Sequence, residues 1–221
     1  MTPAEKTHPS VEHGSAGRFP DDAEFATVWR ELVEESRAWQ RIDCAAFLER
    51  WCGHAPDDLT RTFTGVNHIG VYLGDYLDDD ELFAWTRYLD GRRAAGEIRG
   101  YETGPSYIAP RQYGTPGWWV SITLEDGGVI ETFTCRRFGP WQERGVEERQ
   151  RLMSHVAIEV GSPEAVRAVL DGLDGGSPDL ESIAYTEGDE IGHTYGHVRN
   201  TPTQAVLEIV YDQAKPAASV A

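Results

Sequence analysis

The chain has 221 residues, of which 40% are hydrophobic and 26% charged, a balance typical of a globular protein with a well-filled core. Its formal net charge of −17 argues against nucleic acid or an anionic membrane surface as a partner, because a polyanion would be repelled. The segment 1–10 has no apolar signal region and no run reaches membrane-spanning length, so we expect a cytoplasmic protein. Cys44, Cys52 and Cys135 are odd in number and lack CxxC spacing, which favours neither disulfides nor a thiolate zinc site.

The first part of the chain is expected to be a disordered tail followed by a helical extension. Residues 1–20 are rich in proline, glycine, serine and charge, a composition typical of disorder. Residues 21–62 contain a helix capped by Asp21 or Asp22, whose apolar residues have helical spacing up to Trp39. A second short helix is predicted from Asp43 to Trp51, before a break at 53–56.

An alternating pattern begins at Phe63 and opens a first βαβββ unit, about residues 63–140. His68, Gly70 and Tyr72 face one side of the predicted strand, and the apolar residues between them face the other. The remaining elements expected in this unit are a helix over 78–90 that ends at Gly91 and strands near 97–102, 117–124 and 128–135. The insertion 103–117, rich in tyrosine and proline, is predicted to be a loop beside a functional face.

The same order of elements recurs after a charged linker over 138–151, in a second unit at about 150–213. Its helix has Ser162 as a cap and Pro163 at the first helical position. The expected elements are a strand over 152–160, a helix over 162–173, strands near 181–187, 192–200 and 205–211, and a tail over 214–221.

Each unit carries one histidine on its first strand and one glutamate on its last. The pair is His68 and Glu131 in the first unit, and His155 and Glu208 in the second. Two imidazoles and two carboxylates in apolar strands are a ligand set for one divalent transition metal, and Ni, Co, Fe, Mn and Zn all suit it. A carboxylate among leucine, isoleucine and valine would also be costly to bury without a cation.

Over residues 63–212 this pattern resembles the vicinal oxygen chelate superfamily, which contains glyoxalase I and extradiol dioxygenases. The resemblance implies an α+β fold in which two βαβββ modules form a half-open barrel around a metal held by His68, Glu131, His155 and Glu208. It leaves open whether the modules pair within one chain or between two chains of a homodimer.

Further candidate residues lie near these ligands. His193, Tyr195, His197 and Arg199 share one face of a predicted strand, and His197 is a candidate acid, base or substrate contact. Glu159 is a candidate supporting partner or base on the strand of His155. The remaining candidate substrate contacts are Tyr72, Tyr107 and Tyr113. Packing is an equally good interpretation of these tyrosines.

The resemblance implies a metal-dependent epimerase, isomerase or lyase acting on a small hydroxy-carbonyl metabolite. The metal would polarise a carbonyl or enediolate oxygen while Glu131 or Glu208 moves a proton on the adjacent carbon. One alternative is an Fe(II) oxygenase that uses His68, His155 and Glu208 as a facial triad, against which Glu131 counts as a fourth ligand. Another is a metabolite- or drug-binding protein without catalytic activity.

Overall fold

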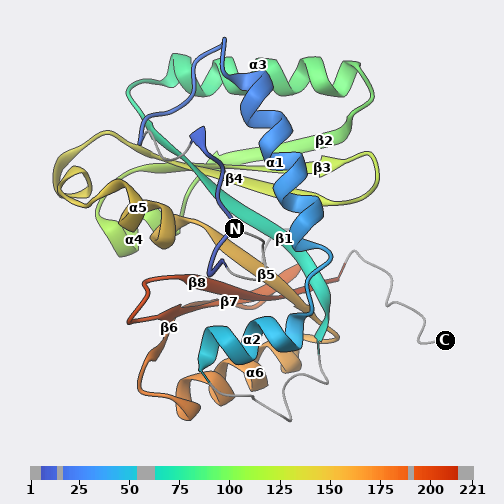
Figure 1. The fold of residues 1–221 in the computed structure, drawn as a ribbon, viewed down its shortest axis with the longest axis vertical. Helices are drawn as coiled ribbons and strands as arrows, with labels where there is room; N and C mark the ends of the chain where they lie inside the picture. Colours follow the sequence, from blue (N-terminus) through green and yellow to red (C-terminus); the bar gives the residue numbers. More distant parts are fainter. Residues whose placement is uncertain (1–5, 14–16, 54–62, 189–191, 214–221) are drawn as a thin grey trace.

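The computed structural model describes residues 6–13, 17–53, 63–188 and 192–213 (Figure 1). The tail predicted over 214–221 lies outside these ranges, as do parts of the predicted tail over 1–20 and of the break at 53–56. No helix of the described residues is long and apolar enough to cross a membrane.

The N-terminal segment packs against the rest of the chain where it is described, contrary to the disordered tail expected over 1–20. Val11 and Phe19 are buried in the main core, and Lys6 pairs with Glu35 at 2.7 Å. The few apolar side chains of this polar segment thus pack into the main core, which the composition of the segment does not predict.

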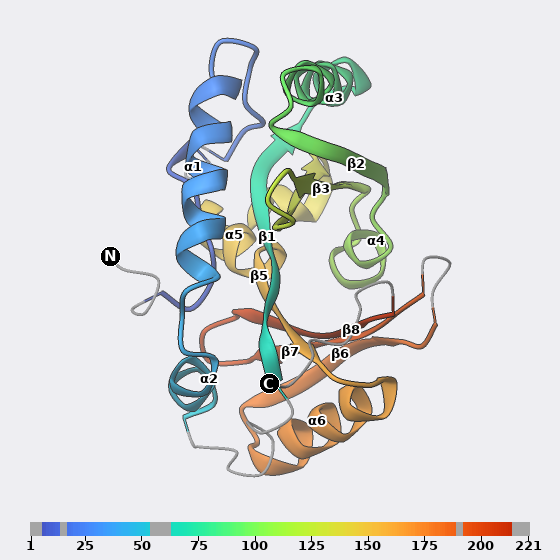
Figure 2. The same cartoon turned by 90° about the vertical axis from the view of Figure 1, so that its right-hand side faces the viewer.

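Two helices follow this segment, α1 (Phe25–Trp39) and α2 (Cys44–Cys52). Asp43 caps α2 as a hydrogen-bond acceptor for the amides of Ala45 and Ala46. Neither aspartate predicted to cap α1 does so, because Glu24 occupies the N-cap position. Figure 2 shows both helices on one side of β1 (Phe63–Tyr76) and α4 (Ile108–Tyr113) on the other.

The first module has the predicted βαβββ order. Its elements after β1 are α3 (Asp79–Ala94), β2 (Ile98–Pro105), α4, β3 (Gly117–Leu124) and β4 (Val129–Arg136). Helix α3 continues past Gly91, the residue expected to end it, and stops before Gly96, which has the positive φ of +73°. The insertion expected to be a loop contains α4, with Gly114 in the left-handed conformation after its last residue.

The second module repeats this order. Its elements are β5 (His155–Val160), α6 (Pro163–Gly176), β6 (Leu180–Thr186), β7 (His193–Asn200) and β8 (Val206–Asp212). Ser162 caps α6 as predicted, accepting a hydrogen bond from the amide of Ala165 at 3.2 Å. The two modules are paired within one chain, because β1 and β5 are antiparallel neighbours.

The strands form one mixed, open, eight-stranded sheet in the order β2-β3-β4-β1-β5-β8-β7-β6. Within each module the first and last strands are parallel neighbours, β1 with β4 and β5 with β8. The α+β fold with paired βαβββ modules, predicted from the repeated pattern, is therefore confirmed.

The predicted linker between the modules is folded. It contains the 3₁₀ helix η4 (Gly139–Glu143) and α5 (Val146–Met153), so β5 begins at 155 and not at the predicted 152. Trp141 is fully buried, and Arg149 forms a buried ion pair with Asp75 of β1. The charged residues of 138–151 suggested a solvent-exposed linker, but one of them, Arg149, is buried against the carboxylate of Asp75.

Candidate metal centre

The four central strands of the sheet carry the four predicted metal ligands, one on each. Glu131 lies on β4, His68 on β1, His155 on β5 and Glu208 on β8. Gly70 of β1 is the register partner of both Glu131 and His155. Because Gly70 has no side chain, the imidazole of His155 can lie over β1, where a Cβ atom at position 70 would be 2.7 Å from its Nε2.

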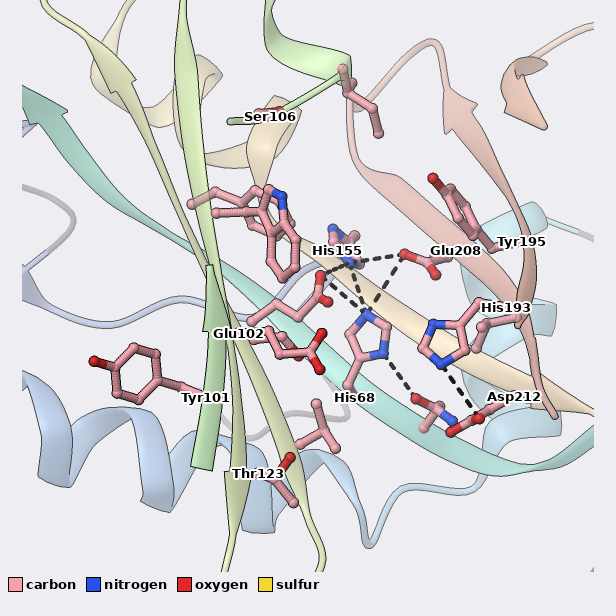
Figure 3. A pocket seen from close by; sticks show the side chains of 18 of the residues that line it. His68, Tyr101, Glu102, Ser106, Thr123, His155, His193, Tyr195, Glu208 and Asp212 are labelled. Carbon is pink, nitrogen blue, oxygen red and sulfur yellow. Dashed lines mark hydrogen bonds and ion pairs between the residues drawn. The ribbon is translucent and has the colours of Figure 1, made fainter. Parts of the chain in front are cut away.

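The donor atoms of these side chains converge, as Figure 3 shows for His68, His155 and Glu208. The Nε2 atoms of His68 and His155 are 3.3 Å apart. Oε2 of Glu208 lies 3.6 Å from Nε2 of His68 and 3.2 Å from Nε2 of His155. Oε2 of Glu131 is 3.6 Å and 3.9 Å from the same two nitrogens.

His197 joins this cluster from β7. It is the register partner of Glu208, and its Nε2 lies 3.1 Å from Oε2 of that residue. Nδ1 of His197 is buried and has no hydrogen-bond partner among the described residues. His193 lies on the same face of β7, four residues before His197, and its Nε2 is 3.3 Å from the carboxylate of Asp212.

For both Glu208 and His155, burial and the neighbouring side chains shift the pKa in opposite directions. Burial alone would raise the pKa of Glu208, but the imidazoles of His197 and His68 and hydrogen bonds with His155 and His197 hold this pKa well below its usual range. Burial lowers the pKa of His155, and the hydrogen bond with Glu208 only partly opposes this shift. An ionised carboxylate and a neutral imidazole are the forms that bind a metal.

The residues fit a divalent cation. Two overlapping sets, His68 with Glu131 and His155, and His155 with His197 and Glu208, each have their donor atoms within 4.8 Å of one another. A cation among these atoms would compensate the negative charge of the two carboxylates. It would also bind the imidazole nitrogens of His68 and His155, which face each other. The mixture of imidazole and carboxylate is typical of transition-metal sites and does not select one metal.

A cavity of about 780 Å³ adjoins the cluster and is lined by all four predicted ligands and by His197. Trp119, Ser121 and Thr123 of β3 form part of its wall, and Phe133 of β4 contributes a further ring. Sequence reasoning missed these residues, although Trp119, Ser121 and Thr123 alternate with the core residues of β3 and therefore share the opposite face of that strand.

Only some of the predicted substrate contacts line the cavity. Tyr107 and Tyr195 line the cavity, whereas Tyr72, Tyr113 and Arg199 do not. Tyr72 and Tyr113 are buried around Trp141 in a separate apolar cluster. Arg199 forms an ion pair with Glu181 at 3.5 Å. Tyr72 and Tyr113 lie away from the cavity because Trp141 of η4 packs against both rings.

Replacing Tyr113 by phenylalanine tests this placement. The hydroxyl donates a hydrogen bond to the carbonyl of Leu152 at 2.8 Å, so Tyr113→Phe is expected to lower the free energy of unfolding by about 1 kcal/mol in urea denaturation. Tyr107→Phe, at an exposed position, is the control and is expected to leave stability unchanged. A Tyr113→Phe protein of normal stability but impaired ligand binding would contradict the placement.

No protein-family model matches the sequence, and no curated protein matches it. Similar solved structures include a mutant of 4-hydroxymandelate synthase from Streptomyces coelicolor, with 13% identity, a TM-score of 0.40, and coverage of 69% of this chain and 50% of that chain. Methylmalonyl-CoA epimerase from Mycobacterium tuberculosis has 11% identity and a TM-score of 0.38, over 72% and 94% of the two chains. A glyoxalase/bleomycin resistance protein/dioxygenase superfamily member from Vibrio splendidus 12B01 has 13% identity and a TM-score of 0.30, over 65% and 96%.

The chain spans half the length of the 4-hydroxymandelate synthase chain that it matches. At this level of similarity the likenesses say nothing about the reaction of this chain.

Proposed function

We propose that this chain is a metal-dependent enzyme, an epimerase, isomerase or lyase, that acts on a small hydroxy-carbonyl metabolite. The observation that carries the proposal is the convergence of two imidazoles and two carboxylates, one from each central strand, beside a cavity. His68, Glu131, His155 and Glu208 would hold one divalent transition metal. When bound, it would supply Lewis-acid polarisation of a carbonyl oxygen, which acidifies the adjacent C–H bond.

Glu131 is the carboxylate that we assign as the base. Its side chain is 21% exposed, whereas that of Glu208 is 8% exposed and lies close to three imidazoles. Glu131 therefore has fewer contacts to lose when it turns toward a substrate proton. A positioned carboxylate of this kind takes a proton from carbon and returns it on the same or the neighbouring atom.

His197 supports this chemistry from the cavity wall. Its ring lines the cavity and its Nε2 contacts Oε2 of Glu208, so it can hold a proton beside the reacting atoms. The rings of Trp119, Phe133 and Tyr195 supply apolar surface that orients a small substrate and excludes water from it.

The proposal is tested by metal identification together with proton exchange. Protein purified without chelator is expected to contain one divalent metal per chain, measured by elemental analysis. With α-hydroxy ketones as probes in deuterated solvent, NMR is expected to show deuterium incorporation without oxygen uptake, and a chelator is expected to stop it. Metal-free protein that also fails to take up added Co²⁺ would refute the metal site.

An Fe(II) oxygenase is the second candidate. The set His155, His197 and Glu208, like the set His68, His155 and Glu208, contains the two imidazoles and one carboxylate of a facial triad. Iron in the protein together with oxygen consumption would replace the isomerase proposal by this one. Tight binding of a metabolite with neither exchange nor oxygen uptake would favour a binding protein without catalytic activity.

A further inference from the structure

A bulge in β1 brings two consecutive side chains to the same face of the sheet. In a regular strand neighbouring residues point to opposite faces. Here Val66 is the partner of Ile158 and His68 is the partner of Ala157, so Asn67 is an extra residue in β1. Asn67 and His68 both line the cavity as a result. Bulges commonly redirect a side chain in this way next to functional sites.

Asn67 links His68 to a carboxylate. Its Oδ1 lies 2.9 Å from Nδ1 of His68, and its Nδ2 donates to Oε2 of Glu159 at 3.1 Å. An ionised carboxylate only accepts hydrogen bonds, so it selects the amide orientation in which Nδ2 faces Glu159 and Oδ1 faces the ring. The proton of a neutral His68 ring is then on Nδ1, and Nε2 presents its lone pair to the cluster.

The corresponding residue of the second module has another role. Ser154 precedes His155 as Asn67 precedes His68, but its Oγ accepts a hydrogen bond from the backbone amide of Tyr72 at 3.0 Å. Ser154 therefore does not give His155 a counterpart of the Glu159–Asn67–His68 chain. This chain joins a residue of β5 to a ligand of β1, and so it crosses the boundary between the modules.

We propose that Asn67 is a positioning residue that fixes the Nδ1-protonated tautomer and the ring orientation of His68, and that Glu159 orients Asn67. The proposal rests on the proposed function in so far as His68 is a metal ligand, but the hydrogen bonds of Asn67 with His68 and Glu159 do not themselves involve a metal. Partners of a metal-binding imidazole usually change affinity by about 10–100-fold when they are removed.

The tautomer is tested on metal-free protein by ¹⁵N NMR of the histidine rings. In the native chain, Nδ1 of His68 is expected to carry the proton and Nε2 to be unprotonated. In Asn67→Leu, which keeps the size of the side chain but removes both hydrogen bonds, we expect a mixture of tautomers. An unchanged Nδ1-protonated signal in Asn67→Leu would overturn the proposal, whether or not the protein binds metal.

Metal affinity gives the second measurement, with Co²⁺ as the probe and its visible spectrum as the readout. Asn67→Leu is expected to bind Co²⁺ about 10–100-fold more weakly, and Ser154→Ala, the matched control in the second module, is expected to bind it normally. Equal affinity and spectra in Asn67→Leu and the native chain would contradict the role of Asn67. Absence of Co²⁺ binding by the native chain would refute the metal site, while the NMR result would still decide the tautomer.

A swap of the two polar groups separates positioning from general stability. Asn67→Asp alone places two carboxylates against each other and is expected to weaken Co²⁺ binding. The double variant Asn67→Asp/Glu159→Gln exchanges amide and carboxylate between the positions, which restores a donor–acceptor pair and keeps an acceptor for His68. We expect it to recover the affinity and the tautomer that Asn67→Asp loses. Failure to recover either would show that Glu159 does not act through Asn67.

Discussion

The Glu131→Gln variant is expected to lose about 10²–10⁴-fold in the rate of solvent-deuterium exchange while it still binds metal. An amide keeps an oxygen that can bind the cation but has no basic site for a substrate proton. Glu131 is the more exposed of the two carboxylates, and its Oε2 is no nearer than 3.6 Å to an imidazole nitrogen of His68 or His155. We therefore expect its loss to affect the proton transfer more than the affinity for the metal.

Glu208→Gln provides the contrast. Oε2 of Glu208 lies within 3.6 Å of three imidazole nitrogens, so this substitution is expected to weaken metal binding itself. The two variants are compared by Co²⁺ titration and by exchange at saturating Co²⁺. If Glu131→Gln exchanges deuterium at the native rate, or if both variants lose metal equally, Glu131 is not the base.

Replacing Asp75 by alanine is expected to lower the free energy of unfolding by about 3–5 kcal/mol, because it leaves the buried charge of Arg149 without its partner. The Asp75 carboxylate also accepts hydrogen bonds from Nε1 of Trp141 at 2.8 Å, from Nε2 of Gln142 at 2.6 Å and from the hydroxyl of Tyr72. Burial raises the pKa of Tyr72 well above its usual range, and Cys135 and Asp75 add to the shift, so the hydroxyl remains a donor.

The measurement is urea denaturation with the slope of the transition checked for constancy. Glu187→Ala is the matched control, because it removes the carboxylate partner of Arg167, and both side chains of that pair are exposed. Exposed pairs contribute about 0–1 kcal/mol, so the control should stay near the native stability. Similar losses in the two variants would mean that the Arg149–Asp75 pair contributes no more than an exposed one.

The sequence predicted most of the fold because each module repeats the same periodicities. Alternation placed His68 and His155 on one face of their strands, and Ser162 with Pro163 identified the start of α6. These signals are local, since each depends on neighbours within a few residues. Because one histidine and one glutamate recur in each module, the sequence also predicted that these four side chains, far apart in the chain, form one site.

The features that were missed depend on contacts between distant segments. Tyr72 has the strand phase of a cavity residue, but Trp141 covers it from a segment expected to be a linker. The position of Asn67 depends on a bulge that is visible only in the pairing of β1 with β5. Neither the partner of a buried arginine nor the register of two strands can be inferred from alternation in one of them.

Gly70 has a consequence for how the two halves of the site depend on each other. It is the register partner of Glu131 in its own module and of His155 in the other, and a Cβ atom there would be 2.6 Å from Nδ1 of His155. A position that offers no ligand thus sets how closely the two repeats approach at the candidate metal centre. Any larger residue at position 70 would separate the halves of the site even if every donor were kept, and a compensating change would have to come from the other repeat.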